Sequence, residues 1–247
     1  MTHWLLLRGL AREQRHFGAF PDAFAAATNA HVTTIDLPGF GTEAHRASPT
    51  TVGAIVDDVR ARFRASTAHA IEPGSPVGIF AISLGGMVAL DWAARYADDF
   101  ARVVVANASA ADLSPPWHRF STSMMTRLPV LVRAPPLERE RTILAITSNR
   151  SERDNAALAV AWARFYDERT PRRSSFARQL FAATRSRAPR AIKAPVLVLT
   201  STADRLVDHR CSRAIAARLR APLRVHGEGG HDITLDAPTW VCEQVAA

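Results

Sequence analysis

The sequence predicts an α/β fold: a mostly parallel sheet with helices on both faces. Three observations support this fold. Short apolar runs rich in Val, Ile and Leu are typical of buried strands, helical patterns alternate with them, and 247 residues, 47% of them hydrophobic, suffice for one such domain. No apolar run approaches the roughly 18 residues of a membrane span, and the first residues lack the basic lead of a signal peptide. We therefore expect neither segment.

The predicted elements alternate along the chain. Strands are expected over residues 3–8, 31–36, 76–82, 102–107, 195–200 and 222–226. Helices are expected near 16–28, 50–65, 85–97 and 209–220, and from about 237. Ligands of such sheets bind beyond the carboxyl ends of the strands, so functional residues are expected in the loops that follow them.

Residues 112–190 interrupt this alternation. Helical patterns there are separated by prolines, so we predict a helical cap inserted into a core of residues 1–111 and 191–247. This stretch holds fifteen arginines against seven acidic residues, a formal charge of +8 that equals the net charge of the whole chain. Its larger apolar side chains are expected to line an acyl pocket or to pack the cap against the core: Trp117, Phe120, Met124, Met125, Trp162, Phe165 and Phe181.

The stretch GIFAISLGG, residues 78–86, carries the first chemical signal. An apolar strand runs into a helix at Ser83, and such a turn holds a serine exposed and strained, as a nucleophile requires. Ala81 and Gly85, two residues to either side, are small enough for strand and helix to pass closely. Ala81 departs from the usual glycine. A plain turn with a capping serine would show a similar pattern.

Two later loops supply a base and an acid for Ser83. Asp204 directly follows the strand at 195–200, and His231 lies in a glycine-rich loop after the last strand. A serine nucleophile needs a histidine base that a carboxylate orients, so Ser83, His231 and Asp204 form a candidate triad. Asp232 is adjacent to His231, but neighbours on a loop rarely point at each other. Asp208 is expected to cap the next helix.

The order Ser, Asp, His along the chain, with each residue after a strand, resembles the α/β-hydrolases. Within them the sequence is most similar to small capped esterases typified by pimeloyl-(acyl-carrier protein) methyl ester esterase of biotin synthesis. The resemblance covers nearly the whole chain and is carried by residues 5–10 (LLLRGL), 36–41 (DLPGFG), 81–86 (AISLGG), 201–207 (STADRLV) and 229–231 (GGH).

The resemblance implies an oxyanion hole formed by the backbone N–H groups of Leu10 and Leu84. Arg8-Gly9 stands where many relatives have His-Gly, but a backbone donor does not need that side chain, and Arg8 could brace the loop. The implied reaction is hydrolysis of a carboxylic ester through an acyl-enzyme. Thioesters, peroxy acids and C–C bonds use the same residues, and some proteins of this fold are non-catalytic ligand receptors.

The basic cap suggests an acidic partner, and an acyl-carrier protein would match the resemblance. The arginines that could bind it are Arg139, Arg141, Arg150 and Arg153. A solvated face in an arginine-rich protein is the alternative. We find no nucleic-acid recognition motif, and we expect no metal or organic cofactor. Two cysteines, Cys211 and Cys242, form no disulfide framework, so a cytoplasmic location is expected.

Overall fold

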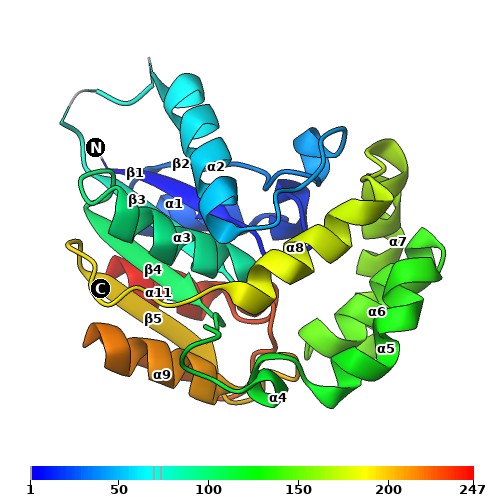
Figure 1. Ribbon diagram of the computed structural model, residues 1–247. Helices are drawn as coiled ribbons and strands as arrows, with labels where there is room; N and C mark the ends of the chain where they lie inside the picture. Colours follow the sequence, from blue (N-terminus) through cyan, green and yellow to red (C-terminus); the bar gives the residue numbers. More distant parts are fainter. Residues whose placement is uncertain (1, 69, 73) are drawn as a thin grey trace.

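The computed structural model describes residues 2–68, 70–72 and 74–247, so positions 1, 69 and 73 of the predicted core lie outside the described residues (Figure 1). Within the described chain, the strands form one sheet in the order β2-β1-β3-β4-β5-β6, and all neighbours are parallel. The strands are β1 (His3–Leu7), β2 (His31–Thr34), β3 (Val77–Ile82), β4 (Arg102–Ala106), β5 (Val196–Ser201) and β6 (Leu223–His226). The predicted fold class is confirmed.

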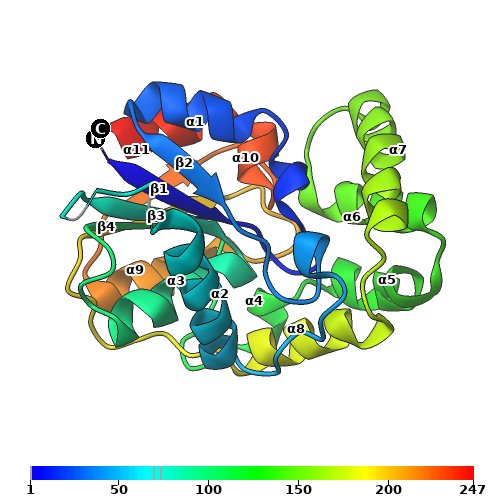
Figure 2. The same ribbon diagram turned by 90° about the horizontal axis from the view of Figure 1, so that it is seen from above.

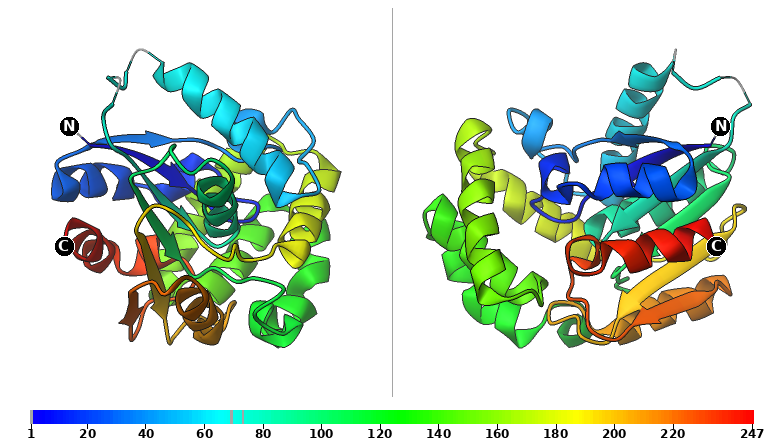
Figure 3. Two further views of the ribbon diagram at one scale, coloured as in Figure 1. Left: turned by 60° about the vertical axis from the view of Figure 1, so that its left-hand side comes forward. Right: turned by 180° about the vertical axis from the view of Figure 1, so that it is seen from behind.

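Helices cover both faces of this sheet (Figure 2, Figure 3). Side chains alternate along each strand, so in β1 Leu5 and Leu7 join one core cluster, whereas Trp4 and Leu6 join the other. The first cluster is shared with α2 (Val52–Thr67), α3 (Leu84–Arg95) and α9 (His209–Leu219), and the second with α1 (Phe20–Thr28), α10 (Ile233–Asp236) and α11 (Pro238–Ala246). Burial on both faces explains why the four central strands, β1, β3, β4 and β5, are mostly apolar, whereas the edge strands β2 and β6 are more exposed and more polar.

One predicted helix is wrong in extent. The helix expected near 16–28 is divided into a 3₁₀ turn, η1 (Gln14–Phe17), and α1, which begins only at Phe20. Gly18 separates them with a φ of +56°, a left-handed conformation that an α-helix cannot include. Pro21 lies in the first turn of α1, where its missing N–H costs no helical hydrogen bond.

The segment between β4 and β5 contains only helices among its secondary-structure elements: α4 (Pro116–Arg119), α5 (Thr122–Arg133), α6 (Pro136–Thr147), α7 (Glu152–Glu168) and α8 (Arg173–Arg185). These helices all fall within the predicted insertion. Pro116 and Pro136 begin α4 and α6, as expected for a residue without an N–H. Figure 1 shows α5 to α8 as a layer beside the carboxyl ends of the strands, where functional residues were expected. One further short element, η2 (Gly41–Glu43), follows β2.

Candidate active site

Ser83 occupies the turn from β3 into α3. Its backbone has φ +56° and ψ −119°, a conformation that costs free energy for any residue with a side chain and is typical of functional positions. The helix passes very close to the loop after β1, because a Cβ at Gly85 would lie 2.5 Å from the carbonyl oxygen of Arg8. The turn therefore requires a residue without a side chain at position 85, as the sequence pattern indicated.

The structure brings Asp204 and His231 together. Asp204 Oδ2 lies 2.7 Å from His231 Nδ1, and because a carboxylate only accepts, the imidazole donates from Nδ1. The other carboxylate oxygen, Oδ1, accepts the N–H groups of Leu206 at 2.8 Å and Val207 at 2.9 Å. The Asp204 side chain is 0% exposed. Both orientation and burial thus fix a hydrogen bond that leaves His231 Nε2 free to accept a proton.

Ser83 and His231 line one cavity, and no hydrogen bond joins their side chains among the described residues. In unliganded enzymes this bond is often long and shortens only when substrate binds. Asp208, as expected, caps α9 by accepting the N–H of Arg210.

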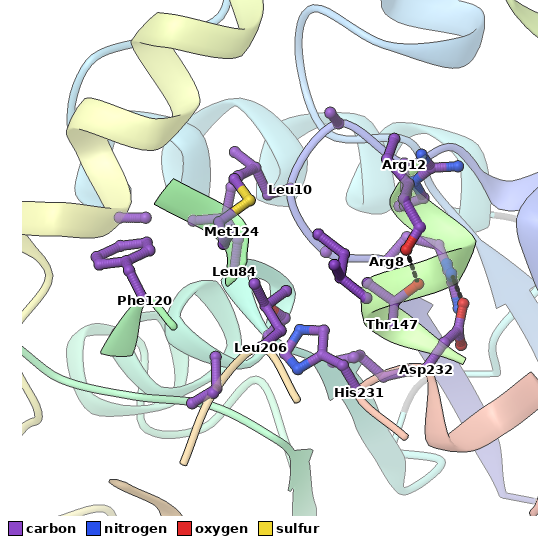
Figure 4. Close-up of a pocket in the computed structure, with 18 of the residues that line it drawn as sticks. Arg8, Leu10, Arg12, Leu84, Phe120, Met124, Thr147, Leu206, His231 and Asp232 are labelled. Atoms are coloured by element: carbon purple, nitrogen blue, oxygen red, sulfur yellow. Dashed lines mark hydrogen bonds and ion pairs between the residues drawn. The ribbon is translucent and has the colours of Figure 1, made fainter. Parts of the chain in front are cut away.

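Asp232 points away from His231 and binds Arg8 instead (Figure 4). Arg8 Nη1 donates to Asp232 Oδ1 at 2.9 Å and to Thr234 Oγ1 at 3.1 Å, and both members of the pair are buried. Burial raises the pKa of Asp232, but the positive charge and hydrogen bonds of Arg8 outweigh this and leave that pKa below its usual value. The pair joins the loop after β1 to the histidine loop.

Two backbone N–H groups beside Ser83 have no protein acceptor within the described chain, those of Leu10 and Leu84. Leu84 is the first residue of α3, so its N–H has no partner inside the helix. Gly9 brings the other loop close, since a Cβ there would lie 3.0 Å from Ser83 Cβ. The residues predicted as oxyanion donors thus lie beside the candidate nucleophile, and both line its cavity.

A short segment at the end of α6 ties together the loops that carry the acid and the base. Asn149 Nδ2 donates to the carbonyl oxygens of Ala203, at 3.0 Å, and Glu228, at 2.8 Å. The carbonyl of Thr147 accepts the N–H of Asp232 at 2.8 Å. Neither contact was foreseen from the sequence, because hydrogen bonds to backbone atoms depend on the fold and leave no residue pattern.

The cavity at Ser83 has a volume of about 100 Å³ and mostly apolar walls. Of the insertion side chains proposed from the sequence, Phe120, Met124 and Trp162 line it, whereas three others are exposed: Trp117 (71%), Met125 (57%) and Phe181 (49%). Sequence reasoning missed several lining residues, namely Arg119, Leu131, Ile143, Ile146 and Phe176. Arg119 is buried and donates to the carbonyls of Ala183 and Thr184, and its burial lowers its pKa.

The four arginines predicted to bind an acidic partner lie in different surroundings: Arg139, Arg141, Arg150 and Arg153. Arg139 is partly buried, with its guanidinium 4.2 Å from the centre of the Tyr166 ring, and the other three are exposed. No carboxylate of the described chain forms an ion pair with any of them. Only Arg139 of the four lines a cavity described for this chain.

Three findings bear on cofactors and surroundings. No group of three His, Cys, Asp or Glu in the part of the chain that the structure describes could hold a metal ion. No helix among the described residues has the length and hydropathy needed to span a membrane. Cys211 and Cys242 are buried free thiols.

Solved structures of low sequence identity share this fold. An esterase from Thermogutta terrifontis superposes with a TM-score of 0.76 at 18% identity, covering 99% of this chain and 88% of that one. Esterase RhEst1 from Rhodococcus sp. ECU1013 gives 0.73 at 21% identity, with coverages of 99% and 88%. The type II thioesterase BorB of the borrelidin biosynthetic cluster gives 0.67 at 18% identity, with 99% and 91%. The chain is thus an α/β-hydrolase by fold.

At the level of sequence, no curated protein matches the chain. A family model does: the one described as "Serine aminopeptidase, S33" matches residues 4–238. This match spans almost the whole chain, from the second residue of β1 to the first residue of α11. The protein therefore belongs to the serine aminopeptidase (S33) family of α/β-hydrolases.

Proposed function

We propose that this protein is a serine esterase that cleaves a carboxylic ester through an acyl-enzyme intermediate. The observation that carries the proposal is the buried bond between Asp204 and His231, 2.7 Å long, in a site where His231 lines the same cavity as Ser83. Ser83 also has the strained backbone of a nucleophile placed between strand and helix. These three residues come from the ends of different strands, so their convergence is a property of the fold.

The reaction would proceed in two stages. Ser83 Oγ attacks the ester carbonyl while His231 Nε2 takes the hydroxyl proton, and Asp204 stabilises the imidazolium through Nδ1. His231 then protonates the departing alcohol, and the acyl group remains on Ser83. In the second stage His231 removes a proton from water, which attacks the acyl-enzyme and releases the acid.

The backbone N–H groups of Leu10 and Leu84 would stabilise the oxyanion of each tetrahedral intermediate. This role is supported by their position beside Ser83 and by the lack of a protein acceptor for either N–H group among the described residues. Donors positioned in this way each contribute about 3 kcal/mol to stabilisation of the transition state. The Arg8–Asp232 ion pair would hold the Leu10 loop against the histidine loop.

The helices α4 to α8 would act as a cap that shapes the acyl site. The cavity of about 100 Å³ has apolar walls from both core and insertion, so a short to medium acyl chain fits it best.

A methyl ester of a pimeloyl chain on an acidic carrier protein is the substrate that we propose, with Arg139, Arg141, Arg150 and Arg153 attracting the carrier. Attraction by these arginines, three of them exposed and Arg139 partly buried, would accelerate the encounter with the carrier and weaken with salt. The free thiols of Cys211 and Cys242 suit a cytoplasmic enzyme.

Hydrolysis of 4-nitrophenyl acetate, butyrate and octanoate by wild type and Ser83→Ala tests the proposal. We expect turnover by wild type and a loss of about 10⁶-fold in kcat in the variant. Tight binding of the esters without turnover would contradict catalysis and indicate a receptor. An acyl-thioester of matched chain length, added to the same assay, separates esterase from thioesterase specificity by the ratio of kcat/KM values.

A further inference from the structure

A second, larger cavity lies next to the one that contains Ser83. Its volume is about 520 Å³, and its walls come from the loops after β1 and β2 and from helices α5 to α8. The two cavities share lining residues, among them Arg12, Leu131, Trp162 and Phe176. The same side chains therefore face the candidate nucleophile on one side and the second cavity on the other.

The walls of the second cavity carry more positive charge than the protein itself neutralises. Its two carboxylates are already engaged: Glu140 is paired with Arg12 at 2.6 Å, and Glu13 is paired with Arg15. Five further arginines line the cavity without an ion pair to any carboxylate of the described chain: Arg133, Arg139, Arg169, Arg172 and Arg173. They surround the turns between α5 and α6 and between α7 and α8.

Two of these guanidinium groups, those of Arg139 and Arg172, are held in place by hydrogen bonds to backbone carbonyls. Arg139 donates to the carbonyls of Leu131, at 3.1 Å, and Ala134, at 3.0 Å. Arg172 donates through Nε to the carbonyl of His45 at 2.8 Å. These three bonds use only some of the five N–H groups of each arginine, so donors remain on both side chains.

Two observations indicate that some hydrogen-bond donors in this cavity have no acceptor within the described chain. Nη1 of Arg169 is buried and has no hydrogen-bond partner in the described chain. A buried cationic donor without a partner is costly, and an anionic acceptor removes that cost. In addition, no side chain of the described chain caps α8, so the N–H groups of Arg173 and Ser174 have no protein acceptor there, whereas that of Ser175 donates to the carbonyl of Arg172 at 2.9 Å.

We propose that the second cavity binds an oxyanion of the substrate, a phosphate or carboxylate group, and that the substrate is therefore an anionic ester. Guanidinium groups bind such oxyanions with two hydrogen bonds each, which suits a cavity with several fixed arginines. Apolar side chains shared by the two cavities, among them Leu131, Trp162 and Phe176, would contact the chain that links the oxyanion to the ester. The statement that the bound oxyanion belongs to a substrate rests on the proposed esterase function. The presence of an anion-binding site does not depend on that function.

Titration calorimetry at low ionic strength with inorganic phosphate, and separately with glutarate, tests the anion site without any turnover. The test variant is Arg133→Gln/Arg173→Gln, because both side chains are exposed and form no hydrogen bond with the part of the chain that the structure describes, so we expect the fold to be retained. The control is Arg164→Gln/Arg185→Gln, which removes the same charge from exposed positions that line neither of the two cavities.

We expect wild type and control to bind at least one of the two anions with equal affinity, and the test variant to bind it at least tenfold more weakly. Preference for phosphate or for glutarate then identifies the oxyanion. Absence of binding by wild type, or equal weakening in both variants, would overturn the proposal, since equal weakening is what a general surface field produces.

A kinetic comparison separates failure of this site from failure of the esterase function. 4-Nitrophenyl hydrogen suberate carries a terminal carboxylate, and 4-nitrophenyl octanoate is its neutral counterpart of equal chain length. We expect wild type to have a severalfold lower KM for the suberate, and Arg133→Gln/Arg173→Gln to lose that difference. Equal KM values in wild type would contradict the anion site. If neither ester is hydrolysed but phosphate binding still distinguishes the variants, the esterase function fails and the anion site stands.

Discussion

The substitution Asp204→Asn tests the proposed triad most sharply, because it changes the chemistry of one carboxylate without changing its shape. Asp204 Oδ1 accepts two backbone N–H groups, from Leu206 and Val207. These donors would hold the amide oxygen of an asparagine in the same place. The NH₂ group would then face His231 Nδ1, where it can only donate.

This reversal predicts a large and specific loss of activity. With the asparagine NH₂ donating to Nδ1, the imidazole proton moves to Nε2, and Nε2 can no longer accept a proton from Ser83. The side chain at position 204 is fully buried, so water cannot replace the lost partner. An orienting carboxylate of this kind contributes about 10⁴-fold to kcat, which corresponds to roughly 5 kcal/mol of transition-state stabilisation.

The assay is kcat for 4-nitrophenyl butyrate together with Tm, measured for wild type, Asp204→Asn and Asp232→Asn. Asp232→Asn is the matched control, since it leaves Arg8 buried without its counter-charge and should cost about 3–5 kcal/mol of stability. That loss would lower Tm by about 10 °C, while kcat changes far less than in Asp204→Asn. Retention of more than a tenth of the activity by folded Asp204→Asn, with activity lost in Asp232→Asn, would refute the assignment of the acid.

Three further results are expected. Gly85→Ala should give little folded, active protein, because the new Cβ would lie 2.5 Å from the carbonyl oxygen of Arg8; yield and circular dichroism check this. Asn149→Ala should lower kcat about tenfold with KM little changed, since the acid and base loops lose their common hydrogen-bond donor. The control Arg164→Ala, at an exposed position, should leave kcat unchanged. The lowered pKa of Asp232 means that its pairing with Arg8 stabilises the folded protein above about pH 4 and is lost as the pH falls through the folded pKa. Wild-type Tm should therefore fall more steeply from pH 6 to pH 3 than that of Asp232→Asn, and parallel curves would contradict this linkage.

Much of the sheet could be predicted because its four central strands, β1, β3, β4 and β5, are buried on both faces. A run such as Arg102–Ala106, with three consecutive valines, is typical of a strand that is buried on both faces of a parallel sheet. The candidate nucleophile, acid and base could be located for a related reason: parallel strands deliver the loops after their carboxyl ends to one edge. The break at Gly18 escaped prediction because apolar periodicity continues across it, and only the backbone dihedral separates η1 from α1.

The contacts that support the site could not be predicted, because they join residues far apart in sequence. Arg8 and Asp232 are 224 positions apart, and nothing local to either residue indicates the other. The second cavity could not be predicted for the same reason. Its arginines come from several helices and the loops between them, and the sequence pattern does not specify how these pack together. The charge count identified the basic segment, but of the four arginines predicted from it only Arg139 lines that cavity, whereas Arg141, Arg150 and Arg153 do not. Which arginines line the cavity is decided by where the helices begin and end, and composition does not show this.

We propose Ser83 as a nucleophile that His231 activates. Labelling with a fluorophosphonate, followed by mass spectrometry of the modified peptide, tests it most directly. We expect one label per chain, on Ser83, with labelling abolished in Ser83→Ala and strongly slowed in His231→Ala. A label on another residue, or none on folded wild-type protein, would contradict it.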